Sequence, residues 1–166
     1  MHDFPKATHL GLISDTHGLL RGEALDALRG SDLILHAGDV GDPEILDTLR
    51  HIAPVVAIRG NVDTEPWADV LPSTEVVTAA GTTIYLLHDL KSLDLIPETA
   101  GFAIVLSGHS HKPLQELRRN VLYINPGSAG PRRFQLPITV ARLNLKVRPW
   151  QADFVAIHPP SGRRTP

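Results

Sequence analysis

Short apolar runs along this chain end repeatedly in polar side chains that can bind metals. The five runs span residues 10–14, 33–37, 55–59, 83–87 and 102–107. The polar residues after them are Asp15 and His17, Asp39, Asn61, His88, and His109 and His111. One such ending is also typical of a plain polar turn, but five coincidental endings of this chemistry are much less expected. A short apolar run predicts a buried strand, and ligands bind at the carboxyl ends of strands in α/β sheets.

Helical patterns separate the first three predicted strands. Residues 21–29 predict a short helix that stops at Gly30, because glycine adopts the left-handed conformation that ends helices. A second helix begins at Asp42, which is a favourable N-cap, with Pro43 at the first helical position. With strands at 8–14, 32–37 and 54–59, the first sixty residues predict a βαβαβ unit with parallel strands.

Beyond Asn61 the pattern shifts toward strands. A hairpin is expected over 75–79 and 82–87, then a short helix over 94–100 and a buried strand over 102–107. Further strands are expected at 114–118, 121–124, 137–145 and 147–157. This order predicts an α/β fold of two packed sheets with helices outside. We expect one domain over residues 1–158, and a disordered tail over 159–166 because of its composition.

Composition excludes several classes of protein. The 166 residues suit one domain, and a net charge of −2 with only scattered arginine pairs predicts no strong affinity for nucleic acid. The absence of cysteine excludes disulfides, a cysteine nucleophile and thiolate zinc sites. No apolar run approaches the roughly 18 residues that a membrane span needs, and the amino terminus has no apolar signal core. A soluble, cytoplasmic protein without membrane partners is therefore expected.

The polar residues at the strand ends form one candidate metal centre. Seven oxygen- and nitrogen-bearing side chains are too many for one four-coordinate ion, and suit two ions that share a carboxylate. Asp39 follows a glycine that permits close approach, so it is the expected bridge. Two adjacent ions can produce a bridging hydroxide that attacks phosphorus. Manganese is the expected ion, and iron, zinc or nickel would also suit these ligands.

The ordered set Asp-x-His, Gly-Asp, Gly-Asn-x-Asp, His and Gly-His-x-His resembles the calcineurin-like metallophosphoesterases, especially their small single-domain phosphodiesterase branch. The resemblance extends from Leu10 to about Asp153, and 125–128 with Pro131-Arg132 resembles a late motif of that branch. It implies a four-layer α/β sandwich of two mixed β-sheets flanked by helices. It also implies a dinuclear metal-dependent phosphodiesterase that acts on a small phosphodiester through a metal-bridging hydroxide.

The resemblance assigns the residues of the site by position. The first metal would be held by Asp15, His17, Asp39 and His111. The second would be held by Asp39, Asn61, His88 and His109. Asp39, Asn61 and His88 are the expected catalytic residues. Larger members of the family carry a histidine, assigned to substrate binding or leaving-group protonation, where this chain has Val62.

Other residues carry weaker expectations. Arg21 and Arg132 could bind phosphate oxygens, although each is also typical of a solvated surface arginine. His36, Asp63 and Asn125 could support the metal ligands from behind, or serve the fold alone. Ser110 lacks the surroundings of a serine nucleophile.

Alternative functions remain open. The same site would suit a phosphomonoesterase or a nucleotide pyrophosphatase. A non-catalytic protein-binding scaffold also occurs on this fold in the retromer subunit, whose metal site is altered. All seven ligand positions are intact here, which favours an enzyme. The natural substrate and the oligomeric state, including a homo-oligomer, stay open.

Overall fold

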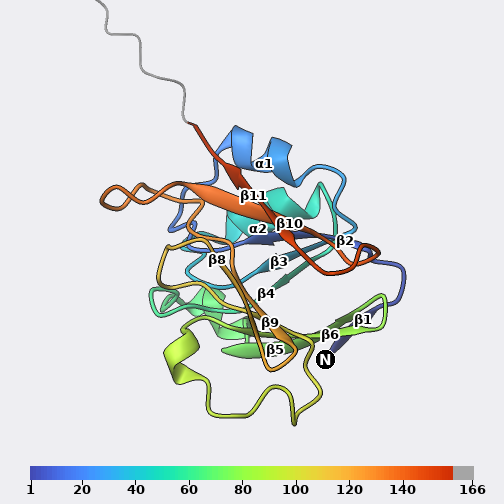
Figure 1. Ribbon diagram of the computed structural model, residues 1–166. Coiled ribbons are helices and arrows are strands. Elements are labelled where there is room, and N and C mark those ends of the chain that lie inside the picture. Colours follow the sequence, from blue (N-terminus) through green and yellow to red (C-terminus); the bar gives the residue numbers. More distant parts are fainter. Residues whose placement is uncertain (159–166) are drawn as a thin grey trace, which may run out of the picture.

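A computed structural model describes residues 1–158, and the predicted tail at 159–166 lies outside the described residues. Two mixed sheets pack face to face (Figure 1). The five-stranded sheet has the order β11-β10-β2-β3-β4, and the six-stranded sheet has the order β1-β5-β6-β7-β9-β8. In the first, β2, β3 and β4 are parallel and β10 is antiparallel to β2 and β11. The prediction of two mixed sheets is therefore confirmed.

The βαβαβ order predicted for the first sixty residues is confirmed from β2 to β4. The five-stranded sheet consists of β2 (His9–Ile13), β3 (Leu33–His36), β4 (Val55–Ala57), β10 (Thr139–Asn144) and β11 (Ala152–Ala156). The other sheet consists of β1 (His2–Phe4), β5 (Thr74–Ala79), β6 (Thr82–Leu87), β7 (Ile104–Leu106), β8 (Leu114–Arg118) and β9 (Val121–Asn125). The helices are α1 (Gly22–Leu28) and α2 (Pro43–Arg50), with 3₁₀ turns η1 (Pro66–Val70) and η2 (Leu90–Ser92).

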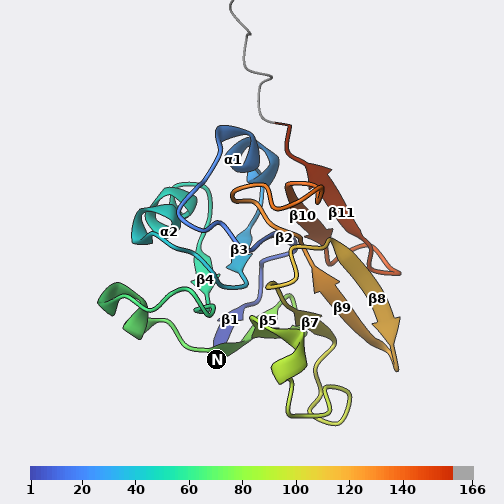
Figure 2. The same ribbon diagram turned by 90° about the vertical axis from the view of Figure 1, so that its left-hand side faces the viewer.

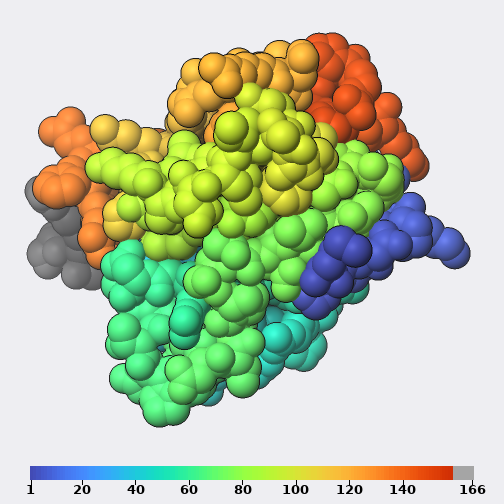
Figure 3. Space-filling view, turned by 90° about the horizontal axis from the view of Figure 1, so that it is seen from below, coloured from blue at the N-terminus to red at the C-terminus, as the bar shows by residue number. Residues whose placement is uncertain are grey.

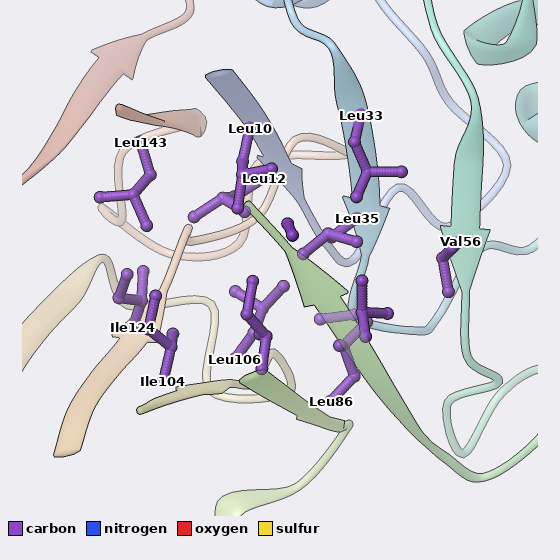
Figure 4. Packing of buried hydrophobic residues seen from close by; sticks show 14 of the residues in the cluster. Leu10, Leu12, Leu33, Leu35, Val56, Leu86, Ile104, Leu106, Ile124 and Leu143 are labelled. Carbon is purple, nitrogen blue, oxygen red and sulfur yellow. The ribbon is translucent and has the colours of Figure 1, made fainter. Parts of the chain in front are cut away.

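Side chains point to alternate faces along the strands, so each face of the five-stranded sheet packs into its own hydrophobic core. Leu33 and Leu35 point between the two sheets, whereas Ile34 points toward the helices. This follows from the period of two along a strand, which sends neighbouring side chains to opposite faces. Figure 4 shows leucines of β2 and β3 meeting Leu86 and Leu106 of the opposite sheet.

Helix α2 begins as its sequence predicts. Asp42 accepts a hydrogen bond from the Glu44 backbone N–H at 2.9 Å, and Pro43 occupies the first turn. The buried face of α2 consists of Ile45, Leu46 and Leu49. Because both helices pack on the outer face of the five-stranded sheet, they fix the loops that follow β2 and β3.

The outer layer on the six-stranded sheet differs from expectation. Residues 90–102, rather than a helix, cover its apolar face of Tyr85, Leu87, Val105, Val121 and Tyr123 (Figures 2 and 3). The predicted helix over 94–100 is wrong, because this stretch forms turns in the structure. Pro97 cannot donate a backbone hydrogen bond and Gly101 adopts a φ of +80°, so a helix nucleus of this length is not extended.

Two further differences concern the sheet edges. The chain begins with β1, which pairs in parallel with β5 from His2 to Phe4, a run too short for its pattern to be recognised. The last strand begins only at Ala152, since the residues before it form a turn. Within residues 1–158, no helix is long and apolar enough to cross a membrane.

Candidate metal centre

The loops after five strands meet at one edge of the molecule. The backbone N–H of Asp15, after β2, donates to the carbonyl of Gly38, after β3, at 3.0 Å. The N–H of Gly108, after β7, donates to the carbonyl of His88, after β6, at 2.9 Å. The two sheets are joined where the His109 N–H donates to Asp15 Oδ2 at 3.1 Å. The expectation that the carboxyl ends of these strands share one location is confirmed.

Two groups of carboxylates and imidazoles lie close enough to hold metal ions. One consists of Asp15, His17 and His111, and the other of Asp15, Asp39 and His88. Asp15 Oδ1 lies 3.3 Å from His111 Nε2 and 4.0 Å from His88 Nε2. Asp39 Oδ2 lies 3.2 Å from His88 Nε2 and 3.8 Å from His17 Nε2. Both carboxylates therefore stand between imidazoles of the two groups.

Each carboxylate has one oxygen held by the protein and one directed into the cluster. Asp15 Oδ2 accepts hydrogen bonds from the Ser14 hydroxyl at 2.7 Å and from the His109 N–H. Asp39 Oδ1 accepts from the Val62 N–H at 2.9 Å. The opposite oxygens, Asp15 Oδ1 and Asp39 Oδ2, face the imidazole nitrogens. Hydrogen bonds to one oxygen fix the direction of the other, as expected for a ligating carboxylate.

The hydrogen-bond pattern of the cluster fits a bound cation. His88 Nδ1 donates to the Ala37 carbonyl at 2.7 Å, so in the neutral ring Nε2 carries a lone pair toward Asp39. Asp15 Oδ1, His88 Nε2 and His111 Nδ1 are buried without a hydrogen-bond partner. A buried lone pair facing a carboxylate is unfavourable unless a proton or a metal ion lies between them.

Asn61 and His109 are the two ligand candidates outside these groups, and they complete the set of seven. His17 Nε2 lies 3.2 Å from His111 Nε2, so two imidazoles converge on one point. Asn61 Oδ1 lies 3.0 Å from His109 Nδ1, and the His109 side chain is 43% exposed. The structure therefore brings together all seven side chains predicted from the sequence, with the Asn61 and His109 side open to solvent.

Burial and neighbouring charges shift the pKa values of the cluster. Burial alone would lower the pKa of His88, but the Asp39 carboxylate 3.2 Å from its Nε2 and the hydrogen bond to the Ala37 carbonyl raise it above its usual value. Burial opposes ionisation of Asp39, yet the nearby His88 ring and the hydrogen bond from Val62 lower its pKa. Burial, aided by the positive charge of Arg133, lowers the pKa of His17. In the His88–Asp39 pair, the two shifts favour the charged form of each partner.

Backbone strain is concentrated at the same residues. Asp15, His17, Asp39, His109 and His111 all have positive φ, between 46° and 65°. This left-handed region is uncommon for residues other than glycine, although Asp, Asn and His enter it most readily. Five strained residues in one cluster indicate that the loops are held to direct these side chains, because such strain gathers at functional sites.

A glycine makes the close approach of two loops possible. A Cβ atom on Gly60 would collide with the backbone N and the carboxylate of Asp39. The Gly-Asn pair after β4 therefore lies directly against the candidate bridge, which brings Asn61 to the cluster.

The three predicted supporting residues all lie behind the ligands. Asp63 accepts hydrogen bonds from the N–H groups of Val40, Gly41 and Gly60 at 2.8–3.1 Å. Asn125 donates to the Gly108 carbonyl at 2.6 Å and accepts from the Gly127 N–H at 2.9 Å. Each therefore holds the backbone of a ligand-bearing loop.

His36 is committed to hydrogen bonds on both ring nitrogens. Its Nδ1 accepts from the Gly38 N–H at 3.2 Å, so its Nε2–H donates to the Thr16 hydroxyl at 3.0 Å. Thr16 in turn donates to the Val40 carbonyl at 2.9 Å. Complete burial lowers the pKa of His36 to about 4, so the ring is neutral. Through these hydrogen bonds, His36 connects the loop after β2 to the loop after β3.

The arginines predicted to bind phosphate have structural partners. Arg21 donates from one terminal nitrogen to the carbonyls of Ala129 and Gly130, at 3.0 and 2.6 Å. Arg132 is exposed and donates to the Leu136 carbonyl at 3.4 Å. Sequence reasoning missed Arg133, whose positive charge helps to lower the pKa of His17. Only its place beside Arg132 in the late motif could have pointed to it.

Two hydroxyl residues hold the backbone near the centre; the late motif pointed to Ser128, and Thr16 was missed. The Ser128 hydroxyl donates to the Asp15 carbonyl at 2.9 Å, and Thr16 makes the contacts described above. Ser128 belongs to the Asn-Pro-Gly-Ser stretch, so that motif is the signal for its place next to the site.

Comparisons with known proteins agree with this geometry. The model of the calcineurin-like phosphoesterase superfamily domain matches residues 9–148. A Methanocaldococcus jannaschii protein named as a probable metallophosphoesterase is 38% identical over 128 residues, covering 72% of this chain and 67% of its own length.

Solved structures show the same fold. A structure described as a novel archaeal phosphodiesterase has 20% identity and a TM-score of 0.75, covering 89% of this chain and 99% of its own. Vps29 of Chaetomium thermophilum has 19% identity and a TM-score of 0.72, covering 91% of this chain and 97% of its own. At this identity the two likenesses concern the fold alone. The match over residues 9–148 decides the assignment: this chain belongs to the calcineurin-like phosphoesterase superfamily.

Proposed function

We propose that this chain is a dinuclear metal-dependent phosphodiesterase. The observation that carries the proposal is the pair of ligand groups, because the carboxylates of Asp15 and Asp39 both approach imidazoles of each group. The first ion would be held by Asp15, His17, Asp39 and His111. The second would be held by Asp39, Asn61, His88 and His109.

Two bound divalent ions would supply a nucleophile from water at neutral pH and neutralise charge on the phosphoryl oxygens. The protein's own part is to hold that chemistry in place. The His88 imidazole would have to be neutral to bind metal, so a proton lying between it and Asp39 would be released as the site is loaded. The charge of Arg133 also contributes positive potential at His17, which would favour an anionic substrate.

Two features favour a diester over a monoester. The Asn61–His109 side of the centre is exposed, so both ester arms have room. The loop also carries Val62, whose side chain is 41% exposed and cannot protonate a leaving group. The preferred substrate class is therefore a small phosphodiester with a good leaving group.

Hydrolysis assays on reconstituted protein test this function. Protein stripped with EDTA and reloaded with Mn²⁺, Zn²⁺, Ni²⁺ or Fe²⁺ is given bis(p-nitrophenyl) phosphate and p-nitrophenyl phosphate. We expect metal-dependent turnover with higher kcat/KM for the diester, and its loss in His111→Gln. The exposed His51 gives the matched control, His51→Gln, which keeps full activity. Preference for the monoester would favour a phosphomonoesterase, and metal binding without any turnover would favour a scaffold.

A further inference from the structure

A largely apolar hollow lies next to the candidate metal centre. Its volume is about 510 Å³, and its walls include Leu90 of η2, Leu114 of β8, and Tyr123 and Ile124 of β9. His109 also lines it, so the hollow opens directly beside a candidate ligand of the second ion. The short 3₁₀ turn η2, below the six-stranded sheet in Figure 2, provides one side of this hollow.

A second hollow, of more polar character, also reaches His109. Its volume is about 520 Å³, and it is lined by polar groups that include Arg59, Asn61, Tyr85 and Asp94. Asp89 and His109 line both hollows, with Asp89 Oδ2 3.8 Å from His109 Nε2. Both hollows therefore reach the Asp89–His109 pair, and one of them is largely apolar whereas the other is more polar.

This arrangement matches the shape of a phosphodiester. A phosphodiester has two ester arms that leave phosphorus in different directions, whereas a monoester has only one. A phosphate bound next to His109 would be able to direct one arm into each hollow. The arm in the apolar hollow would contact leucine side chains and the Tyr123 ring, and aromatic rings pair favourably with one another.

We infer that the apolar hollow receives an aromatic ester arm of the substrate, an inference that rests on the proposed phosphodiesterase function. The hollow is large enough for a single ring or a fused pair of rings. Leu114, which is 42% exposed, is then a specificity residue whose apolar side chain is covered when the substrate binds. Lys91 also lines this hollow and contributes a positive charge there.

Two phosphonates test the inference by binding rather than by turnover. Methylphosphonate and phenylphosphonate share the anionic group, and differ in whether an aromatic ring is present. Isothermal titration calorimetry on the Mn²⁺-loaded protein gives Kd for each. We expect phenylphosphonate to bind about tenfold more tightly, because the ring loses contact with water in the hollow.

Substitutions of residues that line the hollow test whether the hollow causes this preference. Leu114→Ser and Leu90→Ser each reduce the tenfold ratio toward one, and leave Kd for methylphosphonate unchanged. Leu117→Ser is the matched control, because Leu117 is a 68% exposed leucine of the same strand that lines a different hollow. The control keeps the ratio of the unaltered protein.

The outcomes separate the two proposals. Equal binding of both phosphonates, or a ratio that both wall variants leave unchanged, overturns the aromatic subsite while the phosphate site stands. Failure of both phosphonates to bind the metal-loaded protein overturns the proposed function, and the subsite with it.

Discussion

Asp39 uses its two oxygens for different purposes. Oδ1 accepts the Val62 N–H, and Oδ2 faces His17 and His88. Asp39→Asn keeps the size of the side chain and can keep the bond to Val62, but it removes the negative charge between the imidazoles. We expect kcat to fall by at least about 10²-fold, since losing even an outer-shell partner costs 10- to 100-fold. Steady-state kinetics with saturating Mn²⁺ measures this.

The exposed Asp26→Asn is the control, and it retains activity. Turnover of Asp39→Asn at the unaltered rate would show that Asp39 does not bridge the two ions. In that case Asp15, which belongs to both ligand groups, would be the shared carboxylate.

Val62 leaves the site without a side-chain acid at its position. A positioned acid contributes about 10²- to 10⁴-fold when a leaving group needs a proton. Aryl phosphodiesters need little help, whereas alkyl phosphodiesters leave as alkoxides. We therefore expect kcat/KM to depend steeply on leaving-group pKa, and Val62→His to accelerate the poorest leaving groups most. A series of phosphodiesters graded in leaving-group pKa measures both slopes.

Val62→Leu is the control, because it changes the side chain without adding an acid. A shallow slope in the unaltered protein would mean that another group already protonates the leaving oxygen.

The loops after β3 and β4 are held together as one element by Asp63. Its carboxylate accepts three backbone N–H groups from the two loops. Asp63→Ala leaves those donors without this partner, so we expect a loss of about 1–3 kcal/mol in unfolding free energy. Binding at the second ion should also weaken, because Asn61 lies between Gly60 and Asp63. Urea unfolding and Mn²⁺ titration measure the two effects.

Asp69→Ala changes an exposed aspartate of η1 and should leave both quantities unchanged. If Asp63→Ala were as stable as the unaltered chain, the hydrogen bonds of Asp63 would not hold these loops.

The centre could be predicted because its sequence signal is local. Each candidate ligand follows an apolar run within a few residues, and parallel strands bring such ends to one edge, as the seven side chains show. The βαβαβ unit was equally predictable, since Asp42 and Pro43 mark the start of α2.

Contacts made by the folded loops could not be predicted in this way. The place of Arg133 near His17 depends on the course of the chain after β9, and the cover over Tyr85 and Val105 comes from turns without a periodic pattern. The three donors that reach Asp63 come from residues up to 23 positions away.

At the scale of the whole molecule, protons and metal ions compete for one cluster that joins the two sheets. In the metal-free protein the pKa of His88 is raised, so its ion pair with Asp39 contributes stability fully below the unfolded pKa of about 6.5. That contribution is lost as the pH rises through the folded pKa. Metal binding instead becomes stronger as the pH rises, because a metal ion requires the neutral His88 ring.

We therefore expect metal occupancy and hydrolysis to fall together below about pH 6. The rise in Tm on adding Mn²⁺ should grow from pH 5.5 to pH 8. Thermal unfolding with Mn²⁺ or EDTA across this range measures it. A metal-induced shift that stayed constant, or shrank as the pH rose, would contradict competition at His88.

Metal content is the most direct test of the central claim that this fold holds two ions in one centre. Elemental analysis is made on protein reconstituted with Mn²⁺ and freed of excess metal by gel filtration. The seven converging side chains predict close to two ions per chain. A content that stays near one or zero after reconstitution would contradict the dinuclear centre.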